Sequence, residues 1–239
     1  MTSNVLLFMV IPALAALGGG VLAVLWHPNR EVRSLIQHFA AGVVLAALAV
    51  ELLPDIEREH APGLVLIAAF AVGSLFMFGL KIWTKPIEHV EGEETILLGI
   101  PSGLLLATFL DVAVDGFIIG AGFAAGGKTG SILAIGLAVE LLFLGLALTS
   151  DAARGWKILV VSGGLSVIVF LFAVLGSVLL EGATPTVMGG VLAFSAAALL
   201  YLVTEELLME AHEVPEHPIS TLVLFSGFLI FWSIQLVGG

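Results

Sequence analysis

Two aspartates that lie one helical turn apart, Asp111 and Asp115, fall inside an apolar run long enough to cross a bilayer, Leu104–Phe123. Residues four apart share one face of a helix, so both carboxylates point the same way. A carboxylate at the bilayer centre costs about 2.5–3.5 kcal/mol on insertion scales. We therefore expect this face to bind or conduct a cation, or to hold protonated acids.

A third acid accompanies this pair. Glu140 lies near the middle of the next apolar run, Gly130–Ser150, and adjacent antiparallel helices would place it at a similar depth. Three carboxylates beside the small residues Gly116 and Gly145 form an oxygen-rich set suited to a divalent cation. Protonated acids that hydrogen-bond between helices are the alternative. The sequence thus predicts a metal site built from these three acids.

Further ionisable residues lie toward the two ends of the predicted spans. We expect Glu51 to line the entrance, while His38, Glu205 and Glu206 line the exit. His212 would share one helical face with Glu205 if the helix continues that far. Ordinary polarity at the membrane interface is the alternative interpretation of these residues.

The composition is that of a polytopic membrane protein. The mean hydropathy is +1.16, and only 11% of the residues are charged. The net charge of −11, from 19 acids and 8 bases, suits a cation and argues against nucleic acid as a partner. Cysteine is absent, which excludes thiolate ligands and disulfides. No stretch resembles a separate soluble domain, so we expect residues 1–239 to form one transmembrane domain in a lipid bilayer.

Eight apolar segments predict an all-α protein with eight transmembrane helices, because each is close to the roughly 20 residues that a span needs. The first segment lacks a preceding basic region and is too long for a signal peptide, so we interpret it as a retained span. Pro101, inside the fourth segment, is expected to kink its helix. The segments are approximately Val5–Trp26, Val32–Leu53, Leu64–Trp83, Thr95–Phe123, Gly130–Ser150, Ile158–Leu180, Thr186–Leu208 and Ile219–Val237.

The basic residues predict the orientation. The loops that connect spans on one face carry six of the eight lysines and arginines, and this excess marks the cytoplasmic face of a cell (inner) membrane. Both termini are then expected outside the cytoplasm. The six bases are Arg30, Arg33, Lys81, Lys85, Arg154 and Lys157, whereas Arg58 and Lys128 lie on the other face.

An internal repeat is also visible. His38–Asp55 aligns without gaps on Ala193–Glu210, with six of eighteen positions identical. The two segments would cross the membrane in opposite directions, so the repeat is inverted. Transporters commonly use this plan, with the substrate site near the midplane. We expect spans 1–3 to pair with spans 6–8, around a central pair formed by spans 4 and 5.

These features resemble the ZIP (Zrt/Irt-like) family of divalent metal transporters, and the resemblance covers essentially the whole chain. Asp111-Val-Ala-Val-Asp115-Gly116 occupies the place of the family's His-Asn-x-x-Glu-Gly pattern. The segments His38–Pro54 and Tyr201–Leu208 are similar to bacterial members. The resemblance implies transport of Zn²⁺, Mn²⁺, Fe²⁺ or Cd²⁺ into the cytoplasm, with the metal as substrate, no cofactor and no enzymatic activity.

The sequence departs from the family pattern at the metal ligands. Asp111 replaces the first histidine, Val112 replaces the asparagine, and only Glu140 remains of the motif in the fifth span. We therefore expect a single site rather than two bound metals. An all-carboxylate set suits Mn²⁺, Mg²⁺ or Fe²⁺, while the family resemblance keeps Zn²⁺ as a candidate.

Three other functions fit parts of the pattern. The carboxylates could relay protons in a transporter of another solute, or the chain could bind metal as a sensor without moving it. An intramembrane protease fits poorly, because Glu205-Glu206 lacks the arginine one turn later that membrane-embedded CAAX-type proteases have. Aspartyl proteases of this kind place their two aspartates on different helices. Faces of small residues would allow a homodimer.

Overall fold

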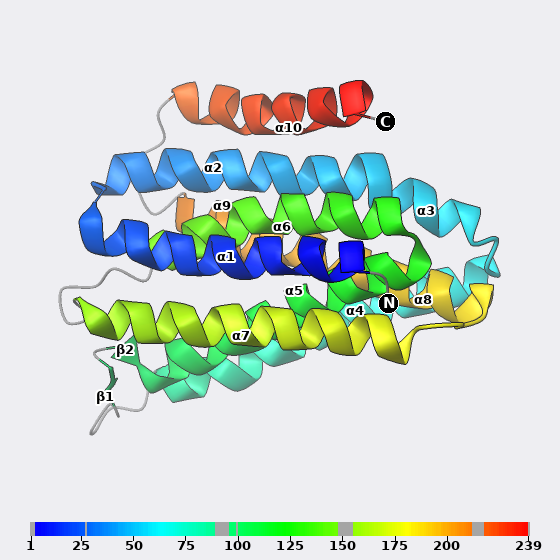
Figure 1. Ribbon diagram of the computed structural model, residues 1–239, viewed down its shortest axis with the longest axis horizontal. Helices are drawn as coiled ribbons and strands as arrows, with labels where there is room; N and C mark the ends of the chain where they lie inside the picture. The colour runs from blue at the N-terminus through cyan, green and yellow to red at the C-terminus, as the bar shows by residue number, and fades with distance from the viewer. Residues whose placement is uncertain are drawn as a thin grey trace.

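The computed structural model describes residues 3–26, 28–88, 96–98, 100–147, 155–211 and 218–238. Within these ranges, eight helical spans are long and apolar enough to cross a membrane. They lie side by side with roughly parallel axes (Figure 1). The predicted all-helical class and the eight helices able to cross a membrane are confirmed. The helices are α1 (Ser3–Leu25), α2 (Arg30–Ala47), α3 (Leu53–Arg58), α4 (Gly63–Glu88), α5 (Ser102–Ala125), α6 (Gly127–Ala147), α7 (Trp156–Leu179), α8 (Pro185–Leu202), α9 (Leu208–Ala211) and α10 (Pro218–Gly238).

Two of the spans contain a π-helical segment. The segment η1 (Leu48–Leu52) joins α2 to α3, and η2 (Val203–Leu207) joins α8 to α9. π-Helical turns are rare and often lie at functional sites. Here they carry Glu51, Glu205 and Glu206, three of the acids that the sequence singles out.

The second span extends beyond its predicted end at Leu53, because the helix continues through Pro54 to Arg58. A proline inside a helix provides no N–H for the carbonyl four residues earlier. That carbonyl belongs to Val50, and the side-chain nitrogen of Gln235 on α10 approaches it at 3.5 Å. The neighbouring helix thus provides a donor where the proline cannot.

The predicted kink at Pro101 is wrong. The helix α5 begins at Ser102, and Pro101 lies just before it, in a two-residue strand, β2 (Ile100–Pro101). This strand pairs in antiparallel fashion with β1 (Ile96–Leu97), in the register Leu97 opposite Ile100. A proline is tolerated ahead of a helix, where its missing N–H costs nothing. The residue therefore limits the start of α5 instead of bending it.

Four helices pack closely around the centre of the molecule. The helices α5 and α6 contact each other, α1 packs on α6 and α7, and α7 packs on α5. A Cβ on Gly120 would lie 2.9 Å from the Cα of Gly176 on α7. A Cβ on Gly19 of α1 would lie 3.1 Å from the Cα of Gly145 on α6. Glycine therefore lets these backbones approach one another at distances that other residues would prevent.

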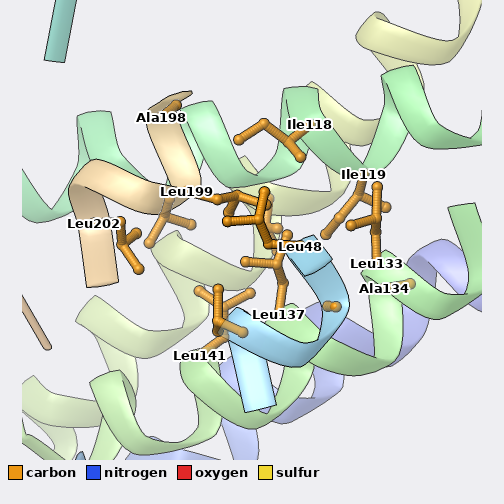
Figure 2. Close-up of a cluster of buried hydrophobic side chains, with 14 of the residues drawn as sticks. Leu48, Ile118, Ile119, Leu133, Ala134, Leu137, Leu141, Ala198, Leu199 and Leu202 are labelled. Carbon is orange, nitrogen blue, oxygen red and sulfur yellow. The ribbon is translucent and has the colours of Figure 1, made fainter. Parts of the chain in front are cut away.

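The remaining four spans flank this group. The helix α2 packs on α10, and α4 packs on α8 (Figure 1). The outward faces of α4 and α10 are strongly apolar and exposed, as helices facing lipid must be. A layer of buried aliphatic side chains lies between η1, α5, α6 and α8 (Figure 2). It includes Leu48, Ile118, Ile119, Leu133, Leu137 and Leu199.

Candidate metal centre

The structure brings together the three acids nearest the middle of their helices. Asp111 and Asp115 extend from α5, and Glu140 extends from the adjacent helix α6. One carboxylate oxygen from each residue lies within 4.8 Å of the other two. All three residues are buried, with 6%, 1% and 3% of their surface exposed, respectively. The spacing of four on α5 and the contact between α5 and α6 together explain this convergence.

The cluster contains oxygen atoms whose hydrogen bonding is incomplete. Both carboxylate oxygens of Asp115 and the Oε2 of Glu140 are buried, and they accept no hydrogen bond from the described residues. Buried polar atoms without a partner are costly, and buried charges are normally paired or bound to a metal. These oxygens are hard ligands of the kind that divalent cations prefer. The donor set therefore fits a cation.

A cavity of about 40 Å³ adjoins the cluster. A water molecule needs roughly 10–15 Å³ on this measure, so the cavity has room for a cation together with water. Asp111 and Glu140 line it from one side, whereas Gln37 of α2 and Glu206 of η2 approach from other helices. Its other lining residues are apolar, and no lysine or arginine lines it within the described part of the chain.

The adjacent acids Glu205 and Glu206 have different surroundings, although the sequence predicts both on the exit. Only Glu206 lines the cavity. The side chain of Glu205 is 41% exposed and forms an ion pair with the Nζ of Lys81 on α4. The same Nζ lies 5.9 Å from the ring centroid of Tyr201. Consecutive helical residues point about 100° apart, so only one of the two acids faces the centre.

Glu51, the predicted entrance residue, is buried on η1 but is not part of the cluster of three acids. Its Oε2 accepts a hydrogen bond of 2.7 Å from Gln235, and its Oε1 accepts none from the described residues. Asp55, one turn later, accepts hydrogen bonds from Thr129 at the start of α6 and from Arg58. The contact with Thr129 places Asp55 beside the start of α6, and Glu51 lies one helical turn before Asp55.

The structure describes only one of the two histidines predicted to line the exit, His38. His38 is buried on α2, and its Nδ1 lies 2.8 Å from the carbonyl oxygen of Ser34, which fits an N–H donating to that oxygen. It does not line the cavity. His212 lies outside the described residues, so its predicted place on the exit stays a prediction.

Sequence reasoning missed two residues of these sites, Gln37 and Gln235. Both are amides, whereas the predicted site residues are all ionisable. The sequence does indicate these two residues, because an uncharged polar side chain within an apolar span needs a partner inside the protein. Gln37 is buried on α2, and Gln235 contacts Glu51.

The site and the fold together define a class: a helical protein with eight helices long and apolar enough to cross a membrane, and with a buried cluster of carboxylates. Comparison with models of known protein families and with characterised proteins finds no match to this chain.

Proposed function

We propose that this protein transports divalent metal cations across a membrane, into the cytoplasm, through the cluster of Asp111, Asp115 and Glu140. The observation that carries the proposal is the convergence of three buried carboxylates in mid-helix, in which both oxygens of Asp115 and the Oε2 of Glu140 lack hydrogen-bond donors among the described residues. A buried ionisable group within a membrane span marks an ion pathway more often than a structural contact.

The proposal includes membership of the ZIP family, on the resemblance of the motifs around His38, Asp111 and Glu206. The arrangement of the helices supports it. The two spans that carry the metal ligands, α5 and α6, contact each other, and the flanking spans surround them.

The inverted repeat is part of the same proposal, and the helix boundaries support it. The helices α2 and α8 both have 18 residues, and each continues into a π-helix of five residues. In the gap-free alignment of His38–Asp55 with Ala193–Glu210, Leu48–Leu52 corresponds to Val203–Leu207. The same alignment pairs Glu51 with Glu206. Because π-helices are rare, two at equivalent positions are unexpected in unrelated segments.

Helix packing gives further support to this symmetry. If α1, α2 and α4 correspond to α7, α8 and α10, and α5 corresponds to α6, then the most extensive contacts between these helices should occur in equivalent pairs. The contact of α2 with α10 corresponds to that of α8 with α4, and the contact of α1 with α6 corresponds to that of α7 with α5. All four contacts are extensive. They favour a 3+2+3 inverted repeat.

The proposed pathway is open on one side of the cluster. Glu206 lines the cavity and Glu51 does not. Aliphatic side chains, among them Ile118, Leu137 and Leu199, fill the space between η1, α5, α6 and α8 (Figure 2). With the orientation expected from the basic residues, the open side faces the cytoplasm. The structure then corresponds to a state from which the cation leaves past Glu206.

Metal uptake into proteoliposomes tests the proposal, with Mn²⁺, Zn²⁺, Fe²⁺ and Cd²⁺ supplied separately. We expect uptake of at least one ion by the wild type, and uptake at the level of empty liposomes for Asp115→Ala. Ser162→Ala is the matched control, because it removes a buried hydroxyl on α7 that has no partner among the described residues. This control should transport normally.

Other outcomes of this experiment would redirect the assignment. Normal uptake by Asp115→Ala would exclude the carboxylate cluster as the pathway. Metal binding without uptake would favour a sensor, and uptake of another solute driven only by a pH gradient would favour a proton-coupled transporter.

The absence of cysteine allows a direct test of the proposed orientation. A single cysteine placed at Asn4, the exposed start of α1, should react with an impermeant maleimide added outside intact cells. A cysteine at Lys157, at the start of α7, should react only after the cells are opened. The reverse pattern would place the termini in the cytoplasm.

A further inference from the structure

We infer that the site selects divalent ions that take an all-oxygen octahedral shell, represented by Mn²⁺, over Zn²⁺, and that Asp111 sets this preference. The inference rests on the proposed transport of divalent cations and specifies the ion class of the same site. Its basis is the combination of the acid cluster with the cavity beside it.

Every polar side chain at the site, among the described residues, can offer oxygen. The three acids of the cluster provide carboxylates, and the cavity adds the carboxylate of Glu206 and the amide of Gln37. A cation in the cavity would meet four of these side chains, and water there would bring the oxygen ligands to the six of an octahedral ion. Zinc more often takes four ligands, with imidazole nitrogen or thiolate sulfur among them.

The histidine next to Gln37 does not reach this cavity. His38 follows Gln37 in the chain, but its ring does not line the cavity. Cysteine is absent from the chain. The oxygen-only character of the site is therefore a property of the fold as well as of the composition.

Asp111 has the central position in this arrangement. Asp111 and Glu140 belong both to the acid cluster and to the cavity lining, whereas Asp115 belongs only to the cluster and Glu206 only to the lining. A cation that moves between the two positions keeps Asp111 as a ligand throughout. The chemical type of this one side chain therefore affects every step.

The test compares Mn²⁺ and Zn²⁺ uptake by the wild type and Asp111→His in proteoliposomes at equal free ion concentrations. Zn²⁺ binds most sites more tightly than Mn²⁺, so the informative quantity is the change in the uptake ratio between variants. We expect the Mn²⁺ to Zn²⁺ ratio to fall by at least about tenfold in Asp111→His, the scale on which one ligand alters metal affinity. Glu57→His, which adds an imidazole on the exposed side of α3, is the control and should keep the wild-type ratio.

A second measurement tests the ligand set without transport and without a variant. Pulsed electron paramagnetic resonance of Mn²⁺ bound to the purified wild type detects nitrogen ligands through their magnetic coupling. We expect no imidazole coupling. A histidine coupling would overturn the inference, even if Asp111→His failed to fold.

The outcomes separate this inference from the proposed function. An unchanged uptake ratio in a folded Asp111→His variant, or uptake of Zn²⁺ but not Mn²⁺ by the wild type, would overturn the ion class and leave metal transport intact. Bound Mn²⁺ with oxygen ligands only, but no uptake of any ion, would support the ion class and overturn transport.

Discussion

The two π-helical segments occupy aligned positions in their spans, yet their acids meet different surroundings. Glu51 on η1 accepts a hydrogen bond from Gln235 and belongs neither to the acid cluster nor to the cavity lining. Glu206 on η2 lines the cavity that Asp111 and Glu140 share. The difference shows that two acids at aligned positions can have different environments in one conformation of the protein. If access alternates, these two environments should exchange.

The largest expected effect comes from removing the acid on the open side. Glu206→Gln keeps the shape of the side chain but removes a charge from the cavity, so we expect metal uptake to fall by about 100-fold, the upper end for changes around a metal site. Glu51→Gln should lower uptake by less than about tenfold, because Glu51 lies outside both the cluster and the cavity lining. Initial rates in proteoliposomes measure both variants. If both variants lose uptake equally, the different surroundings of Glu206 and Glu51 do not affect transport.

An intermediate effect is expected from the amide that holds Glu51. Gln235→Leu leaves the Oε2 of Glu51 and the carbonyl of Val50 without this donor. We expect a loss of about 1–3 kcal/mol in the free energy of unfolding, as for other buried acceptors that lose their partner. Unfolding in detergent by denaturant titration measures it.

The pair Gln235→Leu and Glu51→Leu sharpens this prediction. Removing both partners should restore part of the lost stability, since the apolar replacement leaves fewer buried acceptors. If the double variant is less stable by the sum of the single losses, the two side chains act independently.

The smallest effect is expected at the ion pair beside Glu206. Lys81→Met breaks the contact with Glu205, whose side chain is partly exposed, so the loss of unfolding free energy should be below about 1 kcal/mol. Uptake should change little if Glu205 lies off the pathway. A loss of uptake as large as that of Glu206→Gln would assign Lys81 and Glu205 to the pathway after all.

Local patterns in the sequence predict much of this architecture. The eight spans follow from hydropathy, and the common face of Asp111 and Asp115 follows from their spacing of four. The depth of Glu140 in the next span was enough to suggest that it joins them. These inferences hold because a bilayer leaves the backbone little choice except a helix.

The remaining features depend on contacts between helices, which the sequence does not display. Adjacent helical residues always point in different directions, but the sequence does not show which of Glu205 and Glu206 faces the centre, because that depends on how the span packs against its neighbours. The end of the second span was missed because a distant side chain, Gln235, provides a donor near Pro54. Gln37 joins the cavity through the packing of α2 against its neighbours, not through any motif of its own.

The glycine contacts around the centre have a consequence for mechanical freedom. Because α1 meets α6 at Gly19 and Gly145, and α5 meets α7 at Gly120 and Gly176, these four helices have little room to slide or separate. The acids on α5 and α6 are therefore fixed to one stiff block. Any motion that exposes them alternately to the two sides must shift this block as a whole against α2 and α8, the spans that carry the π-helices. The coordination geometry can then stay constant while its surroundings change.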